Sequence, residues 1–256
     1  MTYTVNCSIL LTDLPLLERP AAVKAAGFDA VEFWWPFASA VPATAEVDAF
    51  VSAIQDAGVR LTGLNFFAGD MPGGDRGLVS WIGREDEFRA NVEVVVAIGE
   101  RLGTRAFNAL YGNRIEGADP AAQDALAVQN LAIAAQAVAR IGGTVLLEPV
   151  SGTPAYPLKT AADALAVIER VRDDHGTDDI RLLADFYHLA VNGDDVAAVV
   201  AEHAADFGHI QIADAPGRGE PGTGDLPLSA WIDAVRAGGY RGPIGLEYKA
   251  TQPDPF

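Results

Sequence analysis

Short apolar runs alternate with segments of helical periodicity along almost the whole chain. Three segments, 47–58, 88–103 and 124–143, place apolar residues every three or four positions, which predicts amphipathic helices. Strands that alternate with helices indicate right-handed βαβ units and a parallel sheet. The expected strands cover residues 4–10, 30–35, 60–67, 104–112, 144–150, 180–188, 208–215 and 243–249.

Eight such strands in 256 residues favour an α/β fold of the (β/α)8 TIM-barrel class, as a single domain over residues 1–256. The alternative is a doubly wound open sheet. No Gly-x-Gly-x-x-Gly pattern follows the first strand, which disfavours that alternative and predicts no nucleotide cofactor. The tail ATQPDPF, residues 250–256, is short and Pro-rich, so we expect a truncated or atypical last helix.

The charge balance restricts the possible partners. Eighteen basic residues against 35 acidic ones give a formal charge of −17, which disfavours nucleic acid and anionic membrane surfaces. Cys7 is the only cysteine, so a disulfide within the chain and a Cys-based zinc site are excluded. No signal peptide or membrane-spanning segment is predicted. We expect a cytoplasmic protein, with a homo-oligomer possible if a partner subunit covers the shortened last position.

Polar side chains stand at or near the carboxyl ends of four consecutive expected strands. They are Glu148, Asp185, Gln211 and Glu247, each beside apolar neighbours. Active sites of such barrels lie at this end, where neighbouring strands bring their side chains together. Three crowded carboxylates would repel one another and take up protons unless a cation held them. Oxygen donors suit Mg²⁺ or Mn²⁺ better than Zn²⁺, because this set has no His or Cys.

A lone glutamate at a strand end is more often a capping or ion-paired group than a ligand. The same arrangement on four successive strands favours a functional site. The longest irregular stretch, residues 68–86, follows the third strand. Loops of that length in a compact barrel are usually functional, so we expect it to border the site.

Motifs at nearly every strand end resemble the hydroxypyruvate isomerase family, within the xylose isomerase-like barrels. The resemblance extends over about residues 4 to 250. It implies that Glu148, Asp185, Gln211 and Glu247 bind one divalent cation, and that the two glutamates are also the acid/base pair. Gln211 favours this family over sugar epimerases, which usually have His there. The motifs are GFDAVEFWWPF (27–37), LNFFAGDMPGGDRGL (64–78), GRE (83–85), LLEPVS (146–151), LLADFYH (182–188), HIQIADAPGRGEP (209–221) and GYRGPIGLEYK (239–249).

The activity implied by the resemblance interconverts hydroxypyruvate and 2-hydroxy-3-oxopropanoate (tartronate semialdehyde) through a cis-enediolate, so the expected partner is a small hydroxy-keto acid. An isomerase or epimerase of a longer keto acid or sugar, such as a 2-oxo-tetronate, is the nearest alternative. A DNA-repair endonuclease on the same barrel is disfavoured by the negative charge and by only four histidines. A non-catalytic binding protein would predict a broken ligand set, whereas all four residues are present.

The substrate's carboxylate requires a cation, and two residues are candidates. Lys249 lies two residues after Glu247, so both point to the same side of an extended strand. Arg218 lies in the Gly-flanked loop after the seventh strand. The resemblance implies that Arg218 and His188 lie near substrate. The other expected pocket or substrate contacts are Glu32, Asn65 and Asn108.

Two further groups of residues complete the expected site region. His209 lies two residues before Gln211, so its side chain points to the same side of the expected strand but one layer deeper in the barrel. We therefore expect His209 to be a hydrogen-bonded core residue. Aromatic side chains follow the second and third strands and could form an apolar wall around the site, or could equally be core or subunit-interface packing. They are Trp34, Trp35, Phe37, Phe66 and Phe67.

Overall fold

The computed structural model describes residues 2–252 and 255–256, and these form a closed barrel of eight parallel strands. The strands follow one another around the barrel in chain order, and β1 pairs with β8 to close it. The expected (β/α)8 class is therefore confirmed. The strands are β1 (Tyr3–Asn6), β2 (Ala30–Phe33), β3 (Arg60–Asn65), β4 (Ala106–Asn108), β5 (Thr144–Leu147), β6 (Ile180–Asp185), β7 (Phe207–Ile212) and β8 (Ile244–Leu246).

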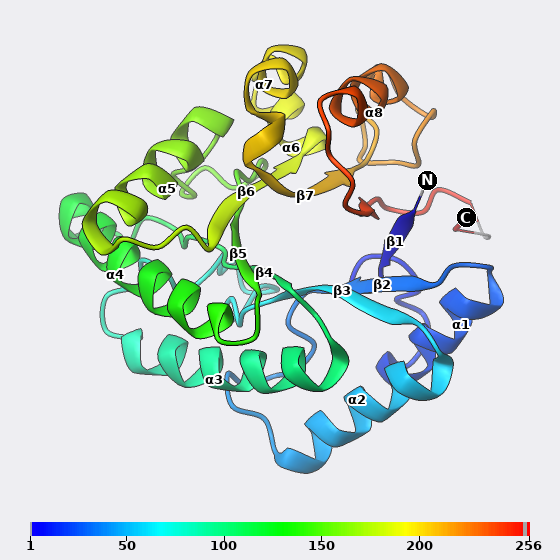
Figure 1. Cartoon of the computed structure of the whole chain (residues 1–256), viewed down its shortest axis with the longest axis horizontal. Helices are drawn as coiled ribbons and strands as arrows, with labels where there is room; N and C mark the ends of the chain where they lie inside the picture. Colours follow the sequence, from blue (N-terminus) through cyan, green and yellow to red (C-terminus); the bar gives the residue numbers. More distant parts are fainter. Residues whose placement is uncertain (1, 253–254) are drawn as a thin grey trace.

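Helices surround the strands on the outside of the barrel (Figure 1). Each strand from β1 to β7 is followed by at least one α-helix, and β6 is followed by two. Two short 3₁₀ turns, Leu16–Glu18 and Ala204–Asp206, complete the regular structure. The helices are α1 (Arg19–Ala25), α2 (Thr44–Ala57), α3 (Glu85–Leu102), α4 (Pro120–Ala139), α5 (Ala161–His175), α6 (Phe186–Val191), α7 (Val196–His203) and α8 (Leu228–Ala237).

The amphipathic pattern explains how the helices pack on the barrel. Helix α2 buries Val47, Phe50 and Ile54, which lie on one face at helical spacing. It ends at Gly58, whose φ of 66° is the left-handed conformation that glycine adopts without steric cost. Helix α3 ends in the same way at Gly103, with φ 74°. The three predicted helices thus exist, although each begins three or four residues earlier than expected.

The expected sixth strand, 180–188, is wrong at its carboxyl end. The strand stops at Asp185, and the next residues form helix α6. Oδ1 of Asp185 accepts the backbone N–H groups of Tyr187 and His188, at 2.8 and 3.2 Å, and this N-cap starts the helix. The apolar and aromatic residues of this stretch favoured a strand by composition. The cap overrides that preference and turns the chain at the mouth of the barrel.

Among the described residues, no helix follows β8, which agrees with the truncated or atypical last helix expected from the short tail. After β8, residues 247–252 and 255–256 contain no helix. The end of the chain lies beside β1, between α8 and α1 (Figure 1). Phe256 packs there on Phe28, with ring centroids 4.9 Å apart. Among the described residues, no helix is long and apolar enough to cross a membrane.

Candidate active site

The four polar residues expected at the strand ends are all buried at the carboxyl end of the barrel. Glu148 directly follows β5, Asp185 ends β6, Gln211 lies within β7, and Glu247 directly follows β8. Ligand atoms of Glu148, Asp185, His188 and Glu247 all lie within 4.8 Å of one another. Gln211 reaches the same group, because its Nε2 lies 3.3 Å from Oε1 of Glu247. The predicted convergence of these strands is therefore present.

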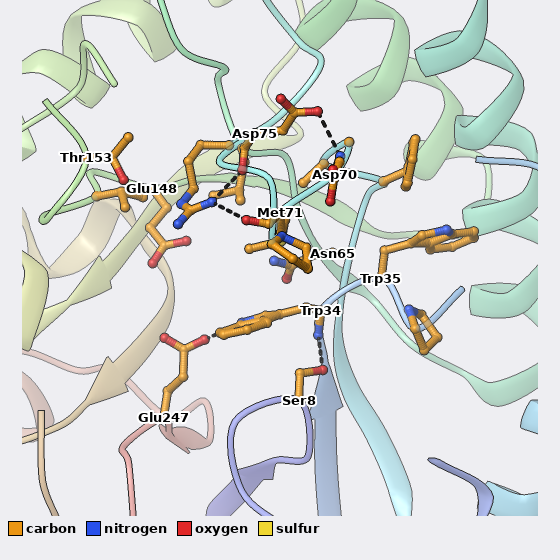
Figure 2. Close-up of a pocket in the computed structure, with 18 of the residues that line it drawn as sticks. Ser8, Trp34, Trp35, Asn65, Asp70, Met71, Asp75, Glu148, Thr153 and Glu247 are labelled. Atoms are coloured by element: carbon orange, nitrogen blue, oxygen red, sulfur yellow. Dashed lines mark hydrogen bonds between the residues drawn. The ribbon is translucent and has the colours of Figure 1, made fainter. Parts of the chain in front are cut away.

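A pocket of about 1450 Å³ opens above this cluster. Glu148 and Glu247 project into it from neighbouring parts of its wall, with the indole of Trp34 beside Glu247 (Figure 2). Trp35, Phe37 and Phe67 are among the aromatic residues that line it. The loop 68–86 also contributes lining residues, including Asp70, Met71, Asp75 and Arg76, as its length predicted. Phe66 does not line this pocket; it is buried in the core against Phe88 and Phe107.

Burial and mutual repulsion make the three carboxylates bind protons tightly. Burial, together with the charges of Glu247 and Asp185, raises the pKa of Glu148 well above its usual range. Burial also raises the pKa of Asp185, although Arg218 and two backbone N–H groups oppose the rise. Burial raises the pKa of Glu247 to about 7, with Arg218 opposing and Asp185 adding to the increase. A cluster of this kind favours a bound divalent cation, which would replace the protons.

Two oxygens of the cluster test whether these residues suit such a cation. Asp185 uses Oδ1 to cap α6, whereas its Oδ2 is buried without a hydrogen-bond partner among the described residues. Oε1 of Gln211 is buried and unpartnered in the same sense. A buried acceptor without a donor costs about 1–3 kcal/mol, so such atoms need an explanation. Carboxylate and amide oxygens are ligands of hard divalent ions, so this donor set fits one.

Arg218 supplies positive charge to the cluster. Its Nη2 pairs with Oε2 of Glu247 and lies 3.8 Å from Oδ2 of Asp185, while its guanidinium stacks 5.5 Å from the ring centre of Tyr187. Burial disfavours its charge, but the carboxylates of Glu247, Asp185 and Glu148 outweigh burial and raise the pKa of Arg218. The side chain expected to bind the substrate's carboxylate therefore already has a carboxylate partner in the protein.

His188 has a fixed tautomer. The backbone N–H of Ser151 donates to its Nδ1 at 3.1 Å, so Nδ1 is the acceptor and Nε2 carries the hydrogen. Nε2 lies 3.7 Å from Oδ2 of Asp185 and 3.9 Å from Oε1 of Glu148. Burial and the nearby Arg218 lower the pKa of His188 to about 3. The residue is thus a neutral hydrogen-bond donor that lines the pocket.

Glu32 and Asn108 lie lower in the barrel than we expected. Both line a small second cavity beneath the cluster, and neither lines the large pocket. Asn108 donates through Nδ2 to Oε2 of Glu148 at 2.7 Å. Glu32 accepts from the Nε2 atoms of Gln211 and His209, both at 2.7 Å. A direct substrate contact is therefore not the role that the geometry gives Glu32 and Asn108, because neither side chain lines the large pocket.

Two of the remaining expected residues line the large pocket, and one lies in the core. Asn65 lines both cavities, and Lys249 is exposed at the large pocket. His209 is the buried, hydrogen-bonded core histidine that its position predicted. The expected site residues thus form two groups: some line the large pocket, and the others lie beneath it and contact the first group.

Two hydrogen-bond donors to Glu247 were not predicted from the sequence. Asn6 donates through Nδ2 at 2.9 Å, and Trp34 donates through its indole N–H at 2.6 Å. Asn6 ends the first strand after an apolar residue, the same signal that marks the acids, but a neutral amide is less informative than a buried charge. Trp34 was expected as part of an apolar wall or as core or subunit-interface packing, and not as a hydrogen-bond donor. An indole N–H that faces a pocket needs an acceptor, which is the physical signal for this contact.

The chain is similar in sequence to known proteins over most of its length. Residues 20–255 match the family described as xylose isomerase-like TIM barrel. A Streptomyces coelicolor protein named "Putative hydroxypyruvate isomerase" is 54% identical over 251 residues, which cover 96% of this chain and 90% of that protein. The 2-oxo-tetronate isomerase of Cupriavidus necator is 34% identical over 249 residues, which cover 96% of this chain and 92% of that protein.

A solved structure is similar over nearly the whole chain. The crystal structure titled AP endonuclease, family 2, from Brucella melitensis superimposes with a TM-score of 0.88 at 29% identity, covering 98% of this chain and 94% of that one. The fold and the family match define a xylose isomerase-like TIM barrel. Within that class the chain belongs to the hydroxypyruvate isomerase family, and it is an isomerase.

Proposed function

We propose that the chain is a divalent-metal-dependent isomerase that interconverts hydroxypyruvate and 2-hydroxy-3-oxopropanoate through a cis-enediolate. The observation that carries the proposal is the group of three buried carboxylates at the base of the pocket. Oδ2 of Asp185 and the nearby amide oxygen of Gln211 have no hydrogen-bond partner among the described residues. The relatives named as hydroxypyruvate isomerases support the choice of substrate.

Glu148, Asp185, Gln211 and Glu247 are the residues that would hold the cation, and Mg²⁺ or Mn²⁺ suits their oxygen atoms. When bound, the cation supplies Lewis-acid polarisation of the substrate's carbonyl and hydroxyl oxygens. His188 adds an N–H donor beside the same carboxylates. The protein thus offers negative oxygens to the metal and a neutral donor to the substrate.

The isomerisation moves one carbon-bound proton and one oxygen-bound proton. A base removes a proton from the carbon that bears the hydroxyl, which gives the enediolate, and an acid returns a proton to the adjacent carbon. The proton of the substrate's hydroxyl leaves its oxygen, and the former carbonyl oxygen gains one. Glu148 and Glu247 are the proposed acid/base pair, since both reach the pocket. A pKa of about 7 for Glu247 suits a group that must both accept and donate a proton near neutral pH.

The substrate's carboxylate needs a cation that the protein does not already neutralise. Arg218 pairs with Glu247, so it can bind substrate only while shared between two acids. Lys249 stands exposed at the pocket and forms no ion pair among the described residues. Arg76 lines the same pocket, and its Nη1 donates only to the backbone carbonyls of Met71 and Asp75. We therefore add Arg76 to Lys249 and Arg218 as a carboxylate-binding residue.

A longer keto acid, such as a 2-oxo-tetronate, is the second candidate substrate. The pocket of about 1450 Å³ exceeds the roughly 300–1000 Å³ that is typical even for drug-sized ligands. A three-carbon acid would leave most of this space to water. The net charge of −17 disfavours a nucleic acid substrate. Comparing kcat/KM for hydroxypyruvate with that for a four-carbon 2-oxo acid distinguishes the two candidates.

The test of the proposed function is isomerase activity on hydroxypyruvate after chelation, with and without added Mg²⁺ or Mn²⁺. We expect activity to be lost on chelation and restored by one of these ions. Glu148→Gln and Glu247→Gln should each reduce kcat by at least ~10²-fold, the scale of lost acid/base catalysis. Full activity in the chelated enzyme would contradict the metal dependence. Near-normal kcat in either variant would remove that glutamate from the proposed acid/base pair.

A further inference from the structure

We infer that Glu32 is a positioning residue that holds the amide nitrogen of Gln211 and so leaves the amide oxygen as the free acceptor for a cation. The inference rests on the proposed function, because it concerns the residues that would hold the cation. Glu32 lies on β2, and its side chain is buried beneath the pocket. It is an additional buried carboxylate in the barrel, and it belongs to neither the proposed ligands nor the proposed acid/base pair.

Three N–H groups surround the carboxylate of Glu32. Oε1 accepts from Nε2 of Gln211 at 2.7 Å and from Nδ2 of Asn6 at 3.2 Å. Oε2 lies 2.7 Å from Nε2 of His209. Both oxygens of Glu32 thus face N–H groups, and Oε1 is the nearest acceptor to the amide nitrogen of Gln211. The three donors come from β1 and β7, so Glu32 links the first half of the barrel to the second.

The two acceptors around Gln211 determine which way its amide points. Its Nε2 lies between Oε1 of Glu32, at 2.7 Å, and Oε1 of Glu247, at 3.3 Å. The amide nitrogen is the donor in both contacts, and the two carboxylate oxygens are the acceptors. The opposite rotamer would set the amide oxygen against two carboxylate oxygens. Oε1 of Gln211 is consequently held on the other side, where it is the buried oxygen without a partner among the described residues.

Two glycines leave the space that this arrangement needs. Gly245 on β8 is paired in register with Gln211 on β7. A Cβ at Gly245 would lie 2.7 Å from both Cγ of Gln211 and Oε1 of Glu32, closer than real Cβ atoms come to other atoms. At Gly63 on β3, a Cβ would lie 3.3 Å from Cβ of Glu32. Strands β3 and β8 therefore carry no side chain at the two positions that lie against the Glu32 side chain.

A simple packing or ion-pairing role for Glu32 makes a different prediction from a positioning role. If Glu32 only neutralised His209 or filled space, the isosteric Glu32→Gln change would alter stability but not the ligand atom that Gln211 presents. If Glu32 orients the amide, the substituted side chain can donate as well as accept, and the amide of Gln211 can then rotate. Metal affinity therefore separates the two roles.

The experiment is calorimetric titration of the chelator-treated full-length protein with Mn²⁺, alongside its unfolding midpoint without metal. Glu32→Gln should weaken Mn²⁺ binding ~10–100-fold, the range for groups that orient metal ligands. Glu169→Gln, the same change at an exposed position of α5, is the matched control and should bind as the wild type does. Raising the Mn²⁺ concentration to saturation should recover most of the kcat that Glu32→Gln loses, because Glu32 acts only through Gln211.

The exchanged pair Glu32→Gln/Gln211→Glu provides a rescue that packing would not predict. The new amide at position 32 donates to the new carboxylate at position 211, which leaves the second carboxylate oxygen facing the cation. The net charge of the protein is unchanged. We expect the exchanged pair to bind Mn²⁺ more tightly than Glu32→Gln alone. Wild-type affinity in Glu32→Gln, or no gain in the exchanged pair, would overturn the inference.

Gly245→Ala tests the same positioning if Glu32→Gln fails to fold. This change removes no polar group, yet it displaces Gln211 and Glu32 from their contact. We expect weaker Mn²⁺ binding in a folded barrel, and an unchanged affinity would refute the inference. A wild-type protein that neither binds Mn²⁺ nor isomerises hydroxypyruvate would instead refute the proposed function. Wild-type binding that Glu32→Gln shares in full would refute the positioning role alone.

Discussion

The two halves of the barrel differ in what they present at their carboxyl ends. Strands β5 to β8 contribute Glu148, Asp185, Gln211 and Glu247, which converge at the base of the pocket. Strands β1, β3 and β4 end in the amides Asn6, Asn65 and Asn108. Two of these amides donate to the glutamates of the other half, Asn6 to Glu247 at 2.9 Å and Asn108 to Glu148 at 2.7 Å.

This difference assigns distinct physical tasks to the two halves. The second half concentrates the carboxylates that would hold the proposed cation, and the first half supplies the N–H groups of Asn6 and Asn108, which orient Glu247 and Glu148 without cancelling their charge. Neutral donors suit that task, because a cationic donor on each glutamate would compete with the metal for the same oxygens. Arg218 is the exception, and it approaches from a loop rather than from a strand.

The largest effect is expected from substitution of Asp185, one of the acids that β5 to β8 contribute. Asp185→Asn keeps an oxygen that can cap α6, but its amide nitrogen replaces one of the two carboxylate oxygens. We expect Mn²⁺ affinity to fall more than the ~10–100-fold typical of supporting groups, while the unfolding midpoint of the chelated protein changes little. Asp185→Ala is the matched comparison, since it also loses the cap, at a cost of about 1 kcal/mol. Equal Mn²⁺ affinity in Asp185→Asn and wild type would remove Asp185 from the metal site.

The next largest effect is expected from substitution of Asn108, one of the amides that β1, β3 and β4 contribute. The N–H of Asn108 stabilises the charged form of Glu148 and so lowers its pKa. Asn108→Ala removes that donor, and the pKa of Glu148 should rise further. The acid limb of the kcat/KM profile should then move to higher pH, with kcat reduced by ~10-fold for one lost hydrogen bond to a charged group. A profile that keeps its wild-type position would show that Asn108 does not act through Glu148.

The acidic half also predicts how stability depends on pH. Because the pKa values of Glu148, Asp185 and Glu247 are raised, these three groups bind more protons in the folded chain than in the unfolded chain above about pH 4.5, whereas the lowered pKa of His188 has the opposite effect below about pH 6.5. The free energy of unfolding of the chelated protein should therefore fall as the pH rises from about 6.5 to 8, with Glu247 contributing near pH 7. Saturating Mn²⁺ should oppose the fall, because the cation binds the deprotonated form. A chelated protein whose unfolding midpoint does not decrease over this range would contradict the raised pKa values.

The smallest effects are expected from Lys249 and Arg76, which line the large pocket but do not belong to the polar residues at the strand ends. Lys249→Gln should raise KM by about tenfold or less while kcat is retained, because Lys249 is exposed to solvent. Arg76→Gln should raise KM more, since Arg76 is partly buried and its Nη1 is fixed by two carbonyls. A fall in kcat with unchanged KM in either variant would argue against carboxylate binding.

The acids at the ends of β5, β6 and β8 could be predicted from the sequence. Burying a charged residue after an apolar run costs free energy unless another group compensates its charge. Glu148, Asp185 and Glu247 each follow such a run, and the convergence of the strand ends followed from the barrel. The alternation of strands and helices, and the shortened tail, predicted the fold for similarly local reasons. These features depend on residues that lie next to one another in the chain.

The supporting half could not be read in the same way, because its contacts join residues far apart in the chain. Glu32 has the strand-end signature of a pocket residue, yet Gln211 and His209 occupy its oxygens from across the barrel. The indole of Trp34 reaches Glu247 only once β2 and β8 stand on either side of β1. The helix that follows Asp185 was also missed, because a side-chain cap outweighed the strand preference of the residues after it.

The most direct test of the central claim is anomalous diffraction from a crystal of the protein soaked in Mn²⁺. We predict one strong peak per chain, coordinated by Glu148, Asp185, Gln211 and Glu247, with Oε1 of Gln211 and Oδ2 of Asp185 among its ligand atoms. A saturated crystal with no peak at this position, or with a peak bound by other residues, would contradict it.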